Sequence, residues 1–178
     1  LKGRICYGGL DLSSSMDITA FVLVFPPTLN DDKYYVVPFF WIPEDNMKQR
    51  VIRDHVPYDL WTSQGYLYTT VGNVIHYGYI EHSIDELGKM YNIKEIAFDR
   101  WGAVQMTQNL EHMGFTVVPF GQGFKDMSPP TKELMNLVMQ KRLAHNGNPV
   151  LHWMMDNIAI RTDPAGNIKM DKSKSIEK

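Results

Sequence analysis

The stretch RICYGGLD at residues 4–11 indicates how this chain begins to fold, because its side chains alternate at the spacing of a β-strand. One face of the expected strand carries Ile5, Tyr7, Gly9 and Asp11. A β-branched and aromatic run follows at residues 18–25, and another extended run lies at residues 34–42, where Pro38 favours an edge strand or a bulge. Short turns join the three runs, which predicts three neighbouring antiparallel strands.

Helices and strands are expected to alternate in the second half of the chain. Residues 83–86, Ser-Ile-Asp-Glu, form a capping box, so we expect a helix to begin at Ser83. A short buried strand is expected at Glu95–Phe98, a second helix from Trp101, a further strand at Phe115–Pro119 and a third helix from Ser128. Together these elements predict an α/β fold with a central mixed sheet, three antiparallel strands and then parallel strands, flanked by helices.

Three segments between these elements have weaker patterns. Residues 43–79 show no sustained period, and we expect them to cover a sheet edge with one short helix near Met47–His55. Residues 149–160 fit a helix or a strand equally well by periodicity. Residues 163–167, Asp-Pro-Ala-Gly-Asn, predict a turn.

The composition excludes several classes of protein. The chain has 178 residues, 44% hydrophobic and 21% charged, which excludes disordered, collagen-like and disulfide-scaffold proteins. Its one cysteine, Cys6, excludes an internal disulfide and predicts a reducing, intracellular compartment. The longest apolar run, at residues 18–27, is too short to cross a membrane, and nothing resembles a secretion signal. Because the first residue is Leu1 rather than Met, we expect residues 1–178 to be one domain of a longer polypeptide.

The charge is unevenly distributed along the chain. Residues 1–120 carry 9 Lys or Arg against 14 Asp or Glu, whereas residues 121–178 carry 9 against 6. An acidic body with a basic flank suits a protein that holds cations in one place and phosphates in another. On charge alone, an uneven solvated surface explains the pattern equally well.

Asp11 and Asp99 are the candidate metal-binding residues. Right-handed crossovers bring parallel strands side by side, so the first strand and the Glu95–Phe98 strand are candidate neighbours, each followed by an aspartate. Sites in open α/β sheets form beyond the carboxyl ends of the strands. Two adjacent carboxylates repel unless they share a proton or a cation, and hard oxygen ligands without His or Cys favour Mg²⁺ or Mn²⁺.

Each of these aspartates also has a structural interpretation. Asp99 directly precedes an expected helix and is a good N-cap residue, and Asp11 can open the turn that follows its strand. Asp17 fits a turn residue or an outer-shell neighbour of the site. The shared placement of Asp11 and Asp99 favours the functional interpretation.

Other chemistries find less support. The six histidines form no HExxH pattern, Cys6 lies inside a strand, and no GxxxxGK[ST] phosphate-binding loop occurs. We therefore expect no ATP hydrolysis by these residues alone. Basic residues cluster after Asp99, beginning with Arg100, and Lys125 and Lys132 flank an expected helix start that can hold a phosphate. A solvated basic face is the alternative.

Four blocks of the sequence closely resemble one known family. They are GGLDLSSSMDITAFVLVFP at residues 8–26, IAFDRWGA at 96–103, VPFGQGFKDMSPPTKELMNLV at 118–138 and TDPAGNIKMDKSKSIEK at 162–178. The family is the C-terminal nuclease domain of tailed-phage terminase large subunits. The resemblance implies an RNase H-like fold and a metal-dependent endonuclease that cuts concatemeric double-stranded DNA during genome packaging.

The resemblance assigns roles to particular residues. The family's first metal-binding aspartate matches Asp11, and its second matches Asp99. Its third acidic residue follows an Ile directly after a Glu-Lys pair such as Glu177-Lys178, so we expect the third ligand to lie just beyond this chain. Asp171 does not occupy that motif position. We therefore expect the isolated fragment to be weakly active or inactive, since an incomplete ligand set binds metal weakly.

The implied mechanism is two-metal phosphodiester hydrolysis with two Mg²⁺ or Mn²⁺ ions, Asp11 bridging them and Asp99 holding one. The DNA backbone would be positioned by Arg100, Gln122, Lys125, Ser128 and Lys132. The implied partners are double-stranded DNA, the small terminase subunit, the portal and procapsid, and an ATPase domain earlier in the same chain. A phage-encoded protein in the host cytoplasm, with no membrane association, is the implied setting.

Two other functions remain open on the sequence. One is another RNase H-like nuclease such as a junction resolvase, which would prefer branched to linear DNA. The other is a non-catalytic module that docks the packaging motor, in which Asp11 and Asp99 serve only as turn and cap.

Overall fold

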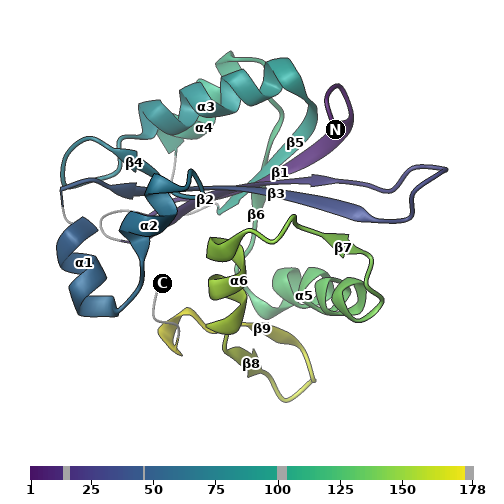
Figure 1. The fold of residues 1–178 in the computed structure, drawn as a ribbon. Coiled ribbons are helices and arrows are strands. Elements are labelled where there is room, and N and C mark those ends of the chain that lie inside the picture. The colour runs from purple at the N-terminus through teal and green to yellow at the C-terminus, as the bar shows by residue number, and fades with distance from the viewer. Residues whose placement is uncertain (14–16, 46, 100–103, 175–178) are drawn as a thin grey trace.

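The computed structural model describes residues 1–13, 17–45, 47–99 and 104–174, and within them a seven-stranded mixed sheet forms the centre of the fold (Figure 1). Six strands follow one another in the order β4 (Tyr68–Thr70), β3 (Tyr34–Pro43), β2 (Thr19–Phe25), β1 (Ile5–Asp11), β5 (Asn92–Asp99) and β6 (Val117–Phe120). The remaining strand, β7 (Leu143–Ala144), pairs with the start of β3.

Helices cover both faces of this sheet (Figure 1). One face carries α3 (Tyr77–Met90) and α4 (Val104–His112). The opposite face carries α5 (Phe124–Met139), α6 (Pro149–Asp156) and a hairpin of β8 (Ile160–Thr162) and β9 (Ile168–Met170), followed by the short 3₁₀ helix η1 (Lys172–Lys174). Two further helices, α1 (Met47–Asp54) and α2 (Tyr58–Ser63), lie near β4. Among the described residues, no helix combines the length and apolarity needed to span a membrane.

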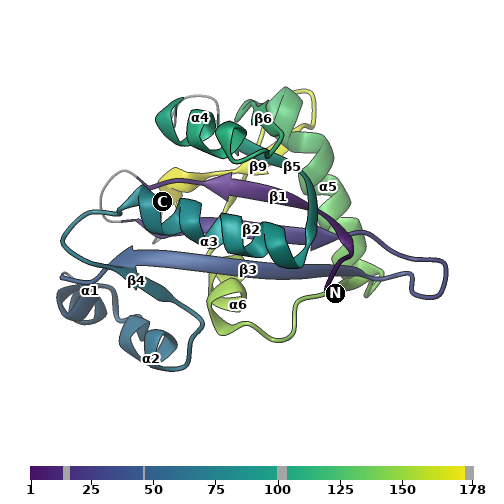
Figure 2. The same ribbon diagram turned by 90° about the horizontal axis from the view of Figure 1, so that it is seen from above.

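The sheet topology confirms the predicted fold class. Strands β1, β2 and β3 form consecutive antiparallel pairs, while β5 pairs with β1 and β6 pairs with β5 in parallel. Figure 2 shows β1 between β2 and the more distant β5, with β3 at the far side of β2. The predicted edge position of Pro38 is also confirmed. On the side of β3 away from β2, β4 pairs only with Trp41–Pro43 and β7 only with Tyr34–Tyr35, so no described strand pairs with the middle of β3 there.

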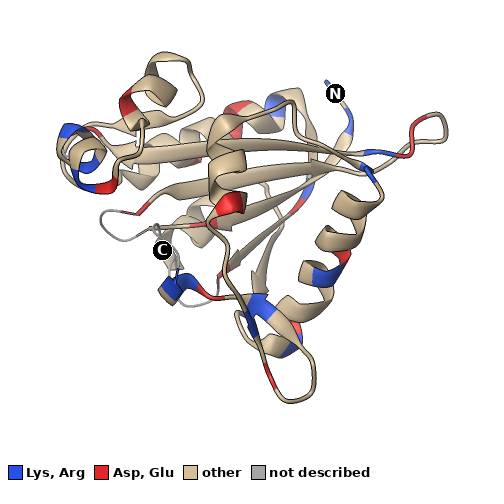
Figure 3. Ribbon diagram, turned by 60° about the horizontal axis from the view of Figure 1, so that its bottom comes forward, with Lys and Arg blue, Asp and Glu red and all other residues tan. Residues whose placement is uncertain are grey.

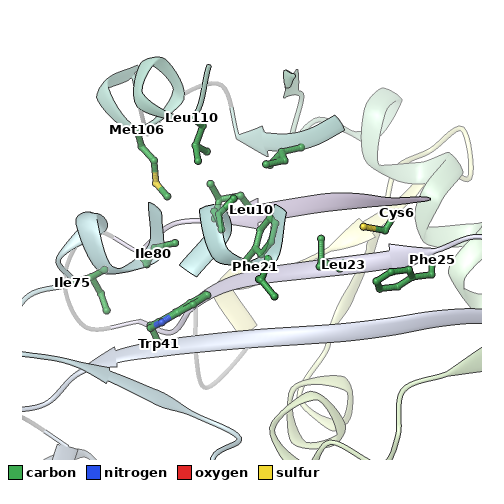
Figure 4. Close-up of a cluster of buried hydrophobic side chains, with 13 residues drawn as sticks. Cys6, Leu10, Phe21, Leu23, Phe25, Trp41, Ile75, Ile80, Met106 and Leu110 are labelled. Atoms are coloured by element: carbon green, nitrogen blue, oxygen red, sulfur yellow. The ribbon is translucent and has the colours of Figure 1, made fainter. Parts of the chain in front are cut away.

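The main hydrophobic core lies between the sheet and the α3–α4 layer (Figure 4). Alternate residues of β1 and β2 point into it, and the helices contribute the apolar residues that the helical spacing predicts; labelled members include Cys6, Leu10, Phe21, Leu23, Ile80, Met106 and Leu110. Gly8 lies on this packed face, where a Cβ atom would be 2.8 Å from Cε2 of Phe21 and 3.2 Å from Cγ1 of Ile96. The opposite face of β1 does not pack into this core.

Two predicted helix starts are wrong. Helix α3 begins at Tyr77, so Ser83 lies inside it and donates its hydroxyl proton to the carbonyl of Tyr79, one turn earlier. Helix α5 begins at Phe124 rather than Ser128, with Pro129 and Pro130 inside the helix. In α3 the favourable cap signal was overridden by tertiary packing, because Ile80 near its start is fully buried.

The segments with weak patterns are resolved by the structure. The predicted helix near Met47–His55 is α1, and residues 43–79 also form α2 and the edge strand β4, which the sequence did not reveal. Residues 149–156 are helical, and Asn148 caps this helix by accepting the N–H groups of Val150 and Leu151, each at 3.0 Å. The predicted helix start at Trp101 lies outside the described residues; α4 is described from Val104.

Candidate active site at the ends of β1 and β5

The carboxyl ends of β1 and β5 bring two aspartates together, as the sequence predicts. In this parallel pair Gly9 lies opposite Ala97 and Leu10 opposite Phe98. Asp11 and Asp99 are the next residue on each strand, and neighbouring strands lie about 4.8 Å apart. Both aspartates line the same cavity. The shared placement inferred from topology is therefore present in the fold.

The cavity has a volume of about 750 Å³ and lies on the sheet face opposite the main core. Its floor is made by small or apolar sheet residues, Gly9, Ala20, Val22, Ala97 and Phe120. Helix α5 contributes Met127, Pro130, Thr131 and Leu134, and the hairpin segment contributes Arg161, Lys169, Met170, Asp171, Lys172 and Ser173. The carboxylates thus border a cavity with a largely apolar lining, and Asp11 itself is 57% exposed to solvent.

Hydrogen bonds fix the chain directly after Asp11. The N–H of Ser13 donates to Oγ1 of Thr19 at 3.0 Å, and the hydroxyl of Thr19 donates to Oγ of Ser13 at 3.2 Å. Both side chains are buried, and the hydroxyl of Tyr77 on α3 donates to the Ser13 carbonyl at 3.1 Å. These contacts tie the end of β1 to its neighbours and so orient Asp11 at the cavity.

The hairpin β8–β9 is docked on α5 by specific hydrogen bonds. The buried hydroxyl of Ser128 accepts the N–H of Ile168 at 3.1 Å, and Nζ of Lys132 donates to the carbonyl of Gly166 at 3.0 Å. From the hairpin, Nζ of Lys169 donates to the carbonyl of Gln122 at 3.1 Å and lies 5.3 Å from the centre of the Phe124 ring. The last contact stabilises the early first turn of α5.

This docking bears on the predicted DNA-contacting residues. Ser128 is only 3% exposed and its hydroxyl holds the hairpin, which gives it a structural role, and its DNA contact stays a prediction. Lys125 and Lys132 are exposed, and Gln122 lines the cavity. Asp17 is half-buried and does not line the cavity, and Arg100 lies outside the described residues.

Two charged residues at the site follow β9. Nζ of Lys172 lies 2.9 Å from Oδ2 of Asp11, an ion pair in which the side chains are 55% and 57% exposed. The side chain of Asp171 accepts both the hydroxyl and the N–H of Ser173, and these hydrogen bonds lower the pKa of its carboxyl below the usual value. The basic composition of the last block was the signal that could have pointed to Lys172, but its partner 161 residues away could not be read from it.

Basic side chains surround this side of the molecule. Figure 3 shows Lys and Arg along α5 and at the β8–β9 hairpin and η1, with acidic residues near the strand ends. Arg161, Lys169 and Lys172 line the cavity, and Lys125 and Lys132 on α5 and Lys174 on η1 are exposed. A basic rim beside paired carboxylates suits a polyanionic substrate held next to a cation site.

The paired carboxylates fit a hard divalent cation. Mg²⁺ commonly takes one or two protein carboxylates and keeps several waters, and Asp11 and Asp99 provide that donor set. Within the part of the chain that the structure describes, no third His, Cys, Asp or Glu joins them in a cluster able to hold a metal. The third ligand expected beyond Lys178 therefore stays a prediction.

Cys6 offers no competing nucleophile. It is fully buried on the opposite face of β1, inside the main core, and this burial raises the pKa of its thiol to about 11. A thiol in that environment is inert.

Comparison with known proteins points in one direction. A family model described as the endonuclease domain of the terminase large subunit matches residues 1–178. The chain is 39% identical over 174 residues to the terminase large subunit of Enterobacteria phage HK97, covering 97% of this chain and 34% of that protein. It is 26% identical over 172 residues to protein YmfN of Escherichia coli K12, covering 93% of this chain and 38% of that protein. The chain thus spans little more than a third of these relatives.

Solved structures agree with this result. The crystal structure of the HK97 bacteriophage large terminase matches with a TM-score of 0.90 at 37% identity, over 98% of this chain and 36% of that one. The large terminase nuclease of thermophilic phage G20c with bound magnesium matches with a TM-score of 0.54 at 14% identity, over 95% and 74%. The second likeness concerns the fold alone, and it agrees with an RNase H-like architecture.

Proposed function

This chain belongs to the endonuclease-domain family of terminase large subunits, and we propose that it cleaves concatemeric double-stranded phage DNA at the cavity shared by Asp11 and Asp99. The observation that carries the proposal is the placement of two carboxylates at the ends of adjacent parallel strands, over a cavity bordered by basic side chains. This arrangement supports a cation site beside a place for a phosphate backbone.

The proposed cofactor is Mg²⁺ or Mn²⁺, held by Asp11 and Asp99. Related phage nucleases have been solved with bound magnesium and with bound cobalt, which supports a divalent cofactor. Two such ions, when bound, would lower the pKa of an attacking water and stabilise the leaving 3′ oxygen. By the family resemblance, Asp11 would help to hold both ions and Asp99 would help to hold one of them.

The residues around the carboxylates would position the substrate. Gly9, Ala20 and Ala97 present little side-chain bulk on the cavity floor, so a DNA strand can approach the carboxylates closely. Met127 and Leu134 on the facing helix line the cavity opposite this floor. Lys125, Arg161 and the helix start at α5 would hold backbone phosphates, which favours weak base specificity.

The same family also supports a proposal for the longer protein and the partners of this domain. We propose that it is one part of a longer packaging protein, since its relatives are about three times its length. The proposed partners are an ATPase domain of the same chain, the small terminase subunit, and the portal and procapsid, in the cytoplasm of the phage-infected host. With the family shown, a junction resolvase no longer competes as an identity.

The proposal is tested by nicking of supercoiled plasmid in Mn²⁺ or Mg²⁺, by this chain and by a version extended past Lys178. Asp11→Asn and Asp99→Asn are compared with Asp85→Asn, which makes the same chemical change on α3 at the opposite face of the sheet. We expect both site variants to lose activity by at least about 100-fold, since two-metal catalysis requires both carboxylates.

The outcomes separate the alternatives. Loss of cleavage in Asp11→Asn and Asp99→Asn, with wild-type activity in Asp85→Asn, supports the proposed site. Cleavage that survives both substitutions rejects it. Folding of each variant is checked by thermal unfolding, so that a collapsed protein is not mistaken for an inactive one.

A further inference from the structure

Lys172 places a positive charge directly on one of the two aspartates of the proposed metal site. Its Nζ lies 2.9 Å from Oδ2 of Asp11, and both residues line the cavity together with Asp99. The contact joins the end of the first strand to a residue 161 positions later in the chain. The family resemblance assigns no role to this lysine, and the proposed hydrolysis does not use it.

The position of Lys172 is set by the elements before and after it. The preceding hairpin is docked on α5 and the loop before it by three hydrogen bonds, at 3.0 to 3.1 Å. Immediately next to the lysine, the N–H of Asp171 donates to the carbonyl of Ala159 at 2.8 Å, and the Asp171 side chain accepts the N–H and hydroxyl of Ser173. Lys172 is therefore presented to Asp11 by a built turn rather than by a loose tail.

A positive charge at this position reduces the repulsion between the two carboxylates. Two carboxylates on neighbouring strand ends repel each other, and the repulsion is relieved by a proton or by a nearby positive charge. The ammonium group of Lys172 supplies that charge on the Asp11 side of the pair. A divalent ion bound to the same oxygen, about 2.1 Å from it, would repel an ammonium group that stays 2.9 Å from that oxygen, so the two cations compete for Asp11.

We infer that Lys172 is itself a residue of the metal site: its ammonium group holds Asp11 while no metal is bound, and a divalent ion must displace it. The inference rests on the proposed function, because it takes Asp11 and Asp99 as the metal ligands. It makes the occupancy of the site depend on where the β8–β9 hairpin holds this lysine, and thereby couples metal binding to the hairpin.

The exposure of the ion pair limits how much Lys172 can change the affinity of the site for a metal ion. Both side chains are more than half exposed, and ion pairs at such sites contribute between zero and about 1 kcal/mol. A metal that must break this pair would therefore bind up to about fivefold more weakly than it would without the lysine. The lysine tunes metal affinity and does not block binding.

A rival arrangement is possible because a carboxylate has two oxygens. The ion could bind through Oδ1 of Asp11 while Lys172 stays on Oδ2 and supports the ligand. In that arrangement, removing the lysine would leave metal affinity unchanged or reduce it. The sign of the change in affinity therefore decides between displacement and support.

The test is isothermal titration of the protein with Mn²⁺ alone, at one pH and ionic strength. Lys172→Gln removes the positive charge, and Lys172→Arg retains it. Lys174→Gln is the control: it makes the same charge change in the same 3₁₀ helix, but the described ion pair with Asp11 is made by Lys172. Asp11→Asn serves to show that the titrated site is the proposed one. A thermal unfolding curve without metal checks that each variant is folded.

We expect Lys172→Gln to bind Mn²⁺ about two- to fivefold more tightly than the wild type, and Lys172→Arg and Lys174→Gln to stay within about twofold. Equal or weaker binding by Lys172→Gln overturns the displacement. A similar gain in Lys174→Gln also overturns it, because general charge would then explain the effect. Binding that Asp11→Asn leaves intact rejects the proposed metal site, and the inference with it, so the two failures are distinguishable.

Discussion

Adding one methyl group to β1 should have opposite consequences on the two faces of the strand. Gly8 and Gly9 are adjacent, and neither has a positive φ that would require glycine. A Cβ at Gly8 would lie 2.8 Å from the ring of Phe21 and 3.2 Å from Ile96, both fully buried. A Cβ at Gly9 would meet nothing within 4 Å, because it points into the cavity.

The magnitudes follow from overpacking and chain entropy. Extra volume in a packed core costs about 1–3 kcal/mol, whereas replacing glycine in a strand returns about 0.5–1 kcal/mol. Gly8→Ala should therefore lower the free energy of unfolding by about 1–2 kcal/mol, or the Tm by about 2–8 °C for a chain of this size. Gly9→Ala should leave the free energy of unfolding unchanged or raise it by up to about 1 kcal/mol.

The free energy of unfolding of both variants is measured by urea unfolding, followed by circular dichroism. The wild type is the common reference, and equal m-values confirm that the compared transitions are the same. If Gly8→Ala is as stable as Gly9→Ala, or more stable, then β1 does not separate a packed core from an open cavity as described.

Three further predictions concern the hairpin, its turn and the core. Ser128→Ala should cost about 1 kcal/mol and speed amide exchange at Ile168, because a partly buried N–H loses its acceptor. Ser83→Ala, with its exposed hydroxyl, is the control, and equal effects would contradict the docking. The side-chain and backbone amides of Asn167 lower the pKa of Asp163, so this turn contributes stability above the ordinary carboxyl pKa and loses it as the pH falls through the folded value. By NMR titration, Asn167→Ala should raise the pKa of Asp163, and an unchanged value would refute the assignment. Cys6, whose pKa is raised to about 11 by burial, should react with a disulfide reagent at pH 8 only after unfolding, whereas rapid labelling of the native protein would contradict its place in the core.

The pairing of β1 with β5 could be predicted from the sequence because it depends on local patterns and general rules. Alternation identifies the strand that ends at Asp11, an apolar run identifies the one that ends at Asp99, and crossover handedness makes them parallel neighbours. The carboxylate pair followed from these facts alone. The family resemblance led to the same two residues independently.

The docking of the hairpin could not be predicted in this way. Ser128 looked like a helix start and a phosphate contact, yet its hydroxyl accepts an N–H group 40 residues later in the chain. Similarly, Lys172 was one of several basic residues until the fold placed it on Asp11. Local sequence gives a side chain its chemistry, but its partner depends on how distant segments pack.

The helix boundaries also depend partly on local sequence and partly on contacts with distant segments. Periodicity identified the buried positions of α3, Ile80, Ile84 and Leu87, but the start at Tyr77 precedes the capping box by a full turn and more. Proline in the first turn suggested Ser128 as the start of α5, while contacts of Phe124 and Gln122 with Lys169 support an earlier turn. Caps predict where a helix can begin, and packing decides where it does.

Whether Asp11 and Asp99 hold a metal ion is tested most directly by the anomalous scattering of manganese in crystals of this protein soaked in Mn²⁺. We predict a peak between the carboxylates of Asp11 and Asp99, with oxygen distances near those of a hard divalent ion and with Lys172 moved away from Oδ2 of Asp11. A crystal of Asp99→Asn should lose or weaken that peak. A manganese peak elsewhere in the cavity, or none in a crystal whose site is open to solvent, would contradict the assignment of these two aspartates as the metal ligands.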